Sequence, residues 1–155
     1  MLFHVSIPAD DPEHVARVVA EIWHASVLPF PPVPGAYMVW LGDERRTVLE
    51  VNPRGSEHVP APGEFGIRSN PAASPHSEAH VAIGMPMSAD EALAIGKREG
   101  WLAQRSNRGG LFEVVELWVE NRFLLELLTD DEQQRYVDNM TLDKLRELFG
   151  PDSSR

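Results

Sequence analysis

An internal repeat with an offset of 76 residues constrains the fold of this chain more than any other feature of its sequence. The opening segment FHVSI at 3–7 returns as AHVAI at 79–83. Ten identities keep the offset without a gap: His4/His80, Val5/Val81, Ile7/Ile83, Ala16/Ala92, Val39/Val115, Leu41/Leu117, Glu44/Glu120, Arg46/Arg122, Leu49/Leu125 and Glu50/Glu126. Because a single shared register accounts for all of them, the chain is predicted to contain a duplicated structural unit.

Each copy predicts the same order of elements, a strand followed by a helix and three further strands. The first helix has Asp11 as N-cap and Pro12 in its first turn. In the second copy, Ser88 and Glu91 form a capping box, and Gly100 ends the helix. The expected strands are 2–7, 27–30, 36–41 and 46–51 in the first copy, and 79–85, 102–106, 111–119 and 122–128 in the second. The predicted fold class is α+β, with two tandem βαβββ modules.

The chain divides into four predicted segments. The first module spans 1–53 and the second spans 79–129. Between them, 54–78 is rich in proline and glycine, which predicts a long linker loop. The remaining residues, 130–155, are predicted to form two C-terminal helices, and the apolar stripe of the second helix needs a partner surface.

Charge and composition argue against several classes of function. The formal net charge is −10, from 24 acidic and 14 basic residues, whereas nucleic acids and anionic membranes bind basic surfaces. No apolar run approaches the ~20 residues of a membrane span, and the first residues lack the pattern of a signal peptide. We therefore expect a cytoplasmic protein with no nucleic-acid or membrane partner. The chain has no cysteine, so a metal site would need His, Asp and Glu ligands.

Two His–Glu pairs survive the duplication: His4 with Glu50, and His80 with Glu126, each 46 residues apart. On their strands these residues alternate with the main apolar set, so they are predicted to point away from the helices. If the two copies pack about a pseudo-two-fold axis, the four side chains converge. Two imidazoles and two carboxylates then form a mixed nitrogen and oxygen site for a divalent metal such as Ni, Zn, Mn or Fe. The alternative is that the four residues pair with one another.

The four residues lie in the segments FHVSIPA, TVLEVNP, AHVAIGM and FLLELLT. In these segments the sequence resembles the vicinal oxygen chelate superfamily, which includes glyoxalases, bleomycin resistance proteins and dioxygenases. The resemblance covers 2–128 and implies curled mixed sheets around a central cavity. It also implies that His4, Glu50, His80 and Glu126 are the metal ligands. The first helix departs from the family because it reads VARVVAEIWHASVLPF and lacks the Ser-x-x-Phe-Tyr and Leu-Gly-Phe signature.

The resemblance implies a metal-dependent lyase or isomerase that binds a small substrate through vicinal oxygens on the metal. A ligand glutamate would move a proton, and the sequence does not choose between Glu50 and Glu126. Four strand residues are predicted to line the cavity and contact the substrate: Met38, Trp40, Glu116 and Trp118. Four arginines are predicted to lie in loops, where they could contact an acidic substrate: Arg54, Arg68, Arg105 and Arg108.

Two other functions stay open. The first is a metal-free small-molecule or drug-binding protein of the same fold. The second is a non-haem iron dioxygenase, although that site needs two histidines and only one carboxylate. The resemblance also implies a homodimer, with the modules paired within one chain or exchanged between two. In the exchanged form, His4 and Glu50 of one chain would meet His80 and Glu126 of the other.

Overall fold

The computed structural model describes residues 3–62 and 64–150, and it contains the predicted βαβββ order twice. The first module comprises β1 (His4–Ala9), α1 (Pro12–Trp23), β2 (Ser26–Pro29), β3 (Tyr37–Trp40) and β4 (Val48–Pro53). The second comprises β7 (Val81–Gly84), α2 (Ala89–Glu99), β8 (Ala103–Asn107), β9 (Glu113–Val119) and β10 (Phe123–Leu128). The predicted α+β class is confirmed.

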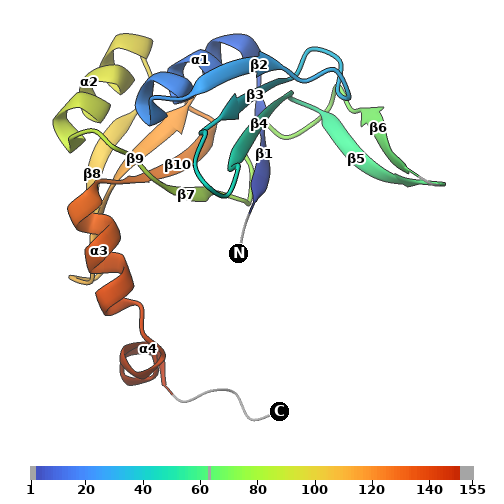
Figure 1. Ribbon diagram of the computed structural model, residues 1–155. Coiled ribbons are helices and arrows are strands. Elements are labelled where there is room, and N and C mark those ends of the chain that lie inside the picture. Colours follow the sequence, from blue (N-terminus) through green and yellow to red (C-terminus); the bar gives the residue numbers. More distant parts are fainter. Residues whose placement is uncertain (1–2, 63, 151–155) are drawn as a thin grey trace.

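Each module folds into its own four-stranded mixed sheet, with the orders β1-β4-β3-β2 and β7-β10-β9-β8. The first strand of each module runs parallel to the last one, and the other neighbours are antiparallel. Figure 1 shows α1 and α2 together on one side of the two sheets, which are open. This topology places the first and last strands of a module side by side, as a site with ligands from both requires.

The face of the first sheet toward α1 is apolar because alternate residues of its strands point to that face. Ile7, Leu49 and Val51 are at most 1 % exposed and belong to one cluster with Val15 and Val19 of α1. Fully burying a side chain of this size contributes about 1.5–3 kcal/mol. His4 and Glu50 lie on the opposite face of β1 and β4. Because the apolar face packs on α1, both side chains point away from the helix.

In the second module, the helix approaches its sheet at a glycine. A Cβ atom built on Gly96 would lie 2.5 Å from the Cβ of Ala103 and 3.1 Å from a methyl group of Leu117. Only a residue without a side chain fits there, because carbon atoms in contact stay about 3.5–4.0 Å apart. The position therefore sets how closely α2 lies on β8 and β9.

Both helix starts follow the sequence prediction. The Asp11 carboxylate accepts a hydrogen bond from the backbone N–H of His14, and Pro12 opens α1. At α2, the Ser88 hydroxyl and the Glu91 carboxylate form the complete capping box. These caps satisfy N–H groups that a helix leaves unpaired at its first turn.

The two modules contact each other at the start of α1. The Glu120 carboxylate, from the turn between β9 and β10, accepts hydrogen bonds from the backbone N–H groups of Asp10 at 2.6 Å and Asp11 at 2.7 Å. Arg54 donates to Asp10 at 2.6 Å and lies 3.5 Å from Glu120. A carboxylate of the second module therefore stabilises the beginning of the first helix.

The helices and the end of β7 extend this contact between modules. Arg98 of α2 pairs with Glu21 of α1 at 2.7 Å. The indole N–H of Trp23 donates to the carbonyl oxygen of Gly84 at 2.7 Å. The modules thus meet through α1, its flanking residues and α2, and strand β1 of the first sheet also contacts β10 of the second.

The segment 54–78 differs from its prediction as a long loop, because it contains the hairpin of β5 (Ser56–Ala61) and β6 (Glu64–Ser69). Polar contacts hold the hairpin, with Arg68 Nε donating to Glu57 at 3.0 Å and Asn70 donating to Glu57 at 2.6 Å. These polar pairs, together with Pro60 within β5, make the hairpin read as a loop in the sequence. Figure 1 shows the hairpin projecting from the body of the molecule.

The two predicted C-terminal helices are present as α3 (Asp130–Asn139) and α4 (Leu142–Phe149). They extend away from the sheets in Figure 1, and neither helix has a buried residue. Residues 151–155 of the predicted segment lie outside the described residues. Within the described ranges, no helix is both long and apolar enough to cross a membrane.

Candidate functional site

The first predicted pair lies on the polar face of the first sheet. Glu50 of β4 stands opposite Ser6 of β1, and His4 stands opposite Val48, one step along the same face. The Ser6 hydroxyl donates a hydrogen bond to Glu50 Oε2 at 2.6 Å. Ser6 therefore orients the Glu50 carboxylate, a role that the sequence does not predict.

The second pair occupies the equivalent place in the second sheet. Glu126 stands opposite Ala82, the repeat equivalent of Ser6, and His80 directly precedes β7. His80 Nε2 lies 3.8 Å from Glu126 Oε2, and Glu126 is 9 % exposed. Both modules thus present one imidazole and one carboxylate, with His4 in β1 and His80 directly before β7.

Arg108 fixes the second glutamate. Its guanidinium contacts Glu126 Oε1 through both Nε and Nη2, with the Nε distance at 3.1 Å. Nη2 also donates to Glu116 Oε1 at 2.8 Å, and Nη1 donates to the Ser106 hydroxyl at 2.5 Å. Arg108 is among the predicted loop arginines, but the sequence carries no signal for this contact, which depends on the sheet order β8-β9-β10.

Burial and hydrogen bonding shift the pKa values of Arg108 and Glu116 in opposite directions. Burial alone lowers the pKa of Arg108, but its hydrogen bonds to Glu126 and Glu116 outweigh burial and raise that pKa. The pKa of Glu116 is lowered, first by the hydrogen bond from the Gln104 amide and also by the bond from Arg108. These shifts favour the charged forms of Arg108 and Glu116.

The other three arginines are also paired with carboxylates. Arg68 lies in β6 and Arg105 lies in β8, so their predicted placement in loops is wrong. Arg105 binds Asp90 at 2.7 Å. Their guanidinium groups already have anionic partners within the chain.

The predicted substrate-contacting residues fall in the same cross-strand rows as the predicted ligands. Met38 stands opposite Glu50, and Glu116 stands opposite Glu126. One step further along these strands, Trp40 stands opposite Val48, and Trp118 stands opposite Leu124. All four of these predicted residues are half-buried.

The expected convergence of the quartet does not occur within one chain. Among residues 3–62 and 64–150, no three His, Asp or Glu side chains form a group that could hold a metal ion. The contact between modules involves the helices, the turn at Glu120 and the strands β1 and β10. A single chain therefore presents two separate half-sites.

Each half-site suits a divalent metal in its chemistry. Two ligand atoms bound at ~2.1 Å to one metal ion lie roughly 3–3.5 Å apart. The distance of 3.8 Å between His80 Nε2 and Glu126 Oε2 is close to that separation. Imidazole nitrogen and carboxylate oxygen are both common ligands of Zn, Ni, Mn and Fe. The residues fit a metal in type and in spacing within the second module.

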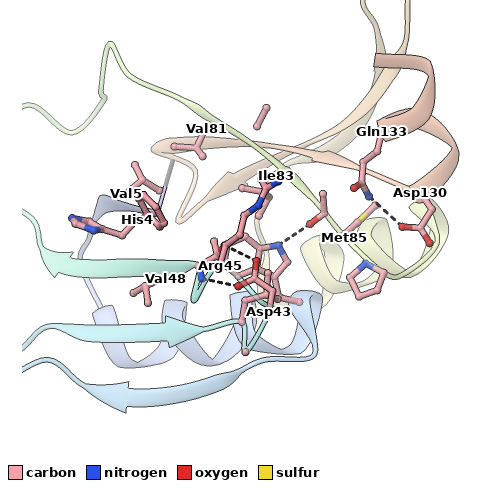
Figure 2. Close-up of a pocket in the computed structure, with 18 residues that line it drawn as sticks. His4, Val5, Asp43, Arg45, Val48, Val81, Ile83, Met85, Asp130 and Gln133 are labelled. Atoms are coloured by element: carbon pink, nitrogen blue, oxygen red, sulfur yellow. Dashed lines mark hydrogen bonds between the residues drawn. The ribbon is translucent and has the colours of Figure 1, made fainter. Parts of the chain in front are cut away.

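A cavity of about 720 Å³ lies between the two modules. His4 belongs to its wall, together with residues of β1, β7, the β3–β4 turn and the start of α3. Figure 2 shows His4 and Val48 on one side of this cavity, and Asp130 and Gln133 on the other. Its volume is in the range of small-molecule sites. Of the four predicted ligands, only His4 lines it.

The structural comparisons place this fold. FosX from Listeria monocytogenes is 12% identical, with a TM-score of 0.56 over 87% of this chain and 97% of that one. Lactoylglutathione lyase from Agrobacterium tumefaciens is 12% identical, with a TM-score of 0.56 over 84% of this chain and 93% of that one. The chain has the fold of the vicinal oxygen chelate superfamily, also called the glyoxalase/bleomycin resistance superfamily.

Two further structures carry the same fold. A FosX mutant from L. monocytogenes, complexed with Mn(II) and 1S,2S-dihydroxypropylphosphonic acid, is 15% identical. Its TM-score is 0.55 over 88% of this chain and 94% of that one. An integron cassette protein from the Halifax Harbour sewage outfall is 12% identical, with a TM-score of 0.53 over 82% of this chain and 96% of that one. No family model matches the chain, and no curated protein matches its sequence.

Proposed function

We propose that the protein is a metal-dependent enzyme of the lyase or isomerase type that acts on a small molecule. The observation that carries the proposal is the duplicated His–Glu pair: His4 lies in β1 beside Glu50 in β4, and His80 lies directly before β7 beside Glu126 in β10. The same fold in a lactoylglutathione lyase and in a FosX complexed with Mn(II) supports it.

The metal would be held by the two imidazoles and the two carboxylates. It would act as a Lewis acid that polarises substrate oxygens and lowers the energy of the oxyanion formed on proton transfer. Glu50 or Glu126 would carry the proton, because each has a carboxylate oxygen beside the site. Ser6 orients the first of these carboxylates and Arg108 orients the second.

A second copy of the chain would complete the site. Because each chain presents two separate half-sites, we propose a homodimer in which His4 and Glu50 of one copy join His80 and Glu126 of the other. The open sheets and the exposure of His4 and His80 support this arrangement, since both imidazoles are accessible to a partner.

Metal analysis with complementing variants tests the proposal. One double variant carries His4→Ala with Glu50→Gln, and the other carries His80→Ala with Glu126→Gln. Neither should retain metal by itself after dialysis against Ni²⁺, Mn²⁺ or Zn²⁺. The heterodimer of the two, isolated by two different affinity tags, should bind one metal ion, because one of its two exchanged sites is intact.

Three results would contradict parts of this proposal. A wild-type protein that binds none of these metals would refute the metal centre. Full metal binding by both double variants would refute the quartet. A heterodimer without metal, formed from chains that dimerise normally, would refute the exchange of modules.

The second candidate function is a metal-free small-molecule-binding protein. Arg108 favours it, because the guanidinium already supplies a positive charge to Glu126. In that case the wild-type protein would bind no transition metal, and its thermal stability would not respond to these metals.

A further inference from the structure

Arg108 divides the Glu126 carboxylate into two unlike oxygens. Both contacts from the guanidinium go to Oε1, while Oε2 is the atom that faces His80 Nε2 at 3.8 Å. A carboxylate without such a contact would rotate about its terminal torsion, which has a broad preference. The arginine thus selects the oxygen that is presented to the imidazole.

Arg108 is itself held in place. Glu116 accepts from Nη2 at 2.8 Å, and Ser106 accepts from Nη1 at 2.5 Å. The Gln104 amide in turn donates to the other oxygen of Glu116 at 2.8 Å. The chain of contacts therefore runs from Gln104 through Glu116 and Arg108 to Glu126, across the strands β8, β9 and β10.

We propose that Arg108 is a positioning residue of the metal site, which holds Glu126 so that it binds the metal through Oε2 alone. This inference rests on the proposed metal-dependent function and adds a residue outside the quartet. The physical reason is that partners in the outer shell of a metal site fix the orientation of the ligands. A guanidinium with two nitrogens on one oxygen fixes both the distance and the direction of that oxygen.

The duplication offers an internal comparison. In the first module the neighbouring strand itself orients Glu50, through the hydroxyl of Ser6. Ala82, which stands opposite Glu126, has no hydroxyl to donate. In the second module, Arg108 from the turn after β8 supplies the hydrogen-bond donor to the glutamate that the neighbouring strand lacks.

Cobalt binding to the purified protein tests this inference. Co²⁺ affinity is measured by calorimetry, and the coordination of the bound ion is followed by its visible absorption spectrum. Arg108→Met should weaken Co²⁺ binding by at least about tenfold and change the spectrum, as losses of outer-shell partners typically do. Arg105→Met is the matched control, because it removes the same charge from β8 at an exposed pair with Asp90. The control should leave affinity and spectrum unchanged.

A conservative variant separates orientation from charge. Arg108→Lys keeps the positive charge but cannot place two nitrogens on Glu126 Oε1. Its Co²⁺ affinity should therefore stay as low as that of Arg108→Met. Full recovery by the lysine variant would overturn the orienting role. If Arg108→Met does not fold, Glu116→Gln provides the second variant, because it loosens the guanidinium and should alter the Co²⁺ spectrum in the same direction.

The outcomes distinguish this inference from the proposed function. Wild-type affinity and spectrum in Arg108→Met would overturn the positioning role and leave the metal centre intact. Tighter Co²⁺ binding in Arg108→Met would also overturn it, since the guanidinium would then be a competitor of the metal. A wild-type protein that binds no Co²⁺ would refute the metal centre, and the inference would fall with it.

Discussion

Glu120 should contribute more to stability than its position in a surface turn suggests. Its carboxylate accepts the backbone N–H groups of Asp10 and Asp11, which belong to the other module, at 2.6 and 2.7 Å. A hydrogen bond to a charged group contributes about 1.5–3 kcal/mol when its partner would otherwise be unsatisfied. Asp10 and Asp11 are exposed, so water replaces part of each bond. We therefore expect Glu120→Ala to lower the free energy of unfolding by about 2 kcal/mol for both bonds together.

Backbone strain does not complicate this substitution. Glu120 has a φ of 52°, in the left-handed region, and alanine would experience the same strain because it also carries a Cβ atom. The measured difference thus reports the two lost hydrogen bonds together with the weaker pair to Arg54 at 3.5 Å. Glu120→Gln keeps a carbonyl acceptor for one of the two N–H groups and should lose about half as much.

Urea unfolding followed by circular dichroism measures the effect. For a chain of this size, a loss of 2 kcal/mol also lowers Tm by about 4–8 °C. The matched control is Glu44→Ala, the repeat equivalent of Glu120, whose side chain is exposed. The control should change stability by less than about 0.5 kcal/mol. Equal stability of the two alanine variants would refute the reasoning, because the contact between modules would then contribute nothing.

Two further predictions concern local packing and pH. Gly96→Ala should destabilise the fold by about 1–3 kcal/mol, because its Cβ would lie 2.5 Å from the Cβ of Ala103; a calorimetric Tm at or above that of the wild type would contradict this. The pKa of Asp43 is lowered, first by the backbone N–H of Thr47 and then by its hydroxyl. A carboxyl group with a lowered folded pKa stabilises the fold above its unfolded pKa of about 3.9, and this contribution disappears as the pH falls through the folded pKa. Tm should therefore fall more steeply between about pH 5 and 2 in the wild type than in Asp43→Asn, and parallel curves would oppose this prediction.

The repeat made the fold predictable because one register fixes many elements at once. The alternation in each copy identifies the strand at or next to His4 and His80, and the capping residues Asp11 and Ser88 locate the helices. The hairpin in 54–78 escaped prediction for a physical reason. Its strands are held by polar contacts such as Glu57 with Arg68, and Pro60 within β5 reads as a strand breaker.

The site was predictable within each module but not between modules. The face of Glu50 or Glu126 follows from the period of a strand, which is local. The contact of Arg108 with Glu126 depends on the order of three strands, and the packing of the modules depends on single contacts such as Glu120 with Asp11. Neither contact produces a periodic pattern in the sequence. The sequence therefore could not predict whether the four residues converge within one chain.

The different partners of the two glutamates have a consequence for how such a site can change. If the two modules were separate identical chains, every substitution beside one glutamate would also stand beside the other. Joining them in one polypeptide removes that constraint, so a serine can accompany Glu50 while an arginine accompanies Glu126. A ligand bound across the modules would then meet two unlike halves, and the protein could distinguish the two ends of an asymmetric molecule.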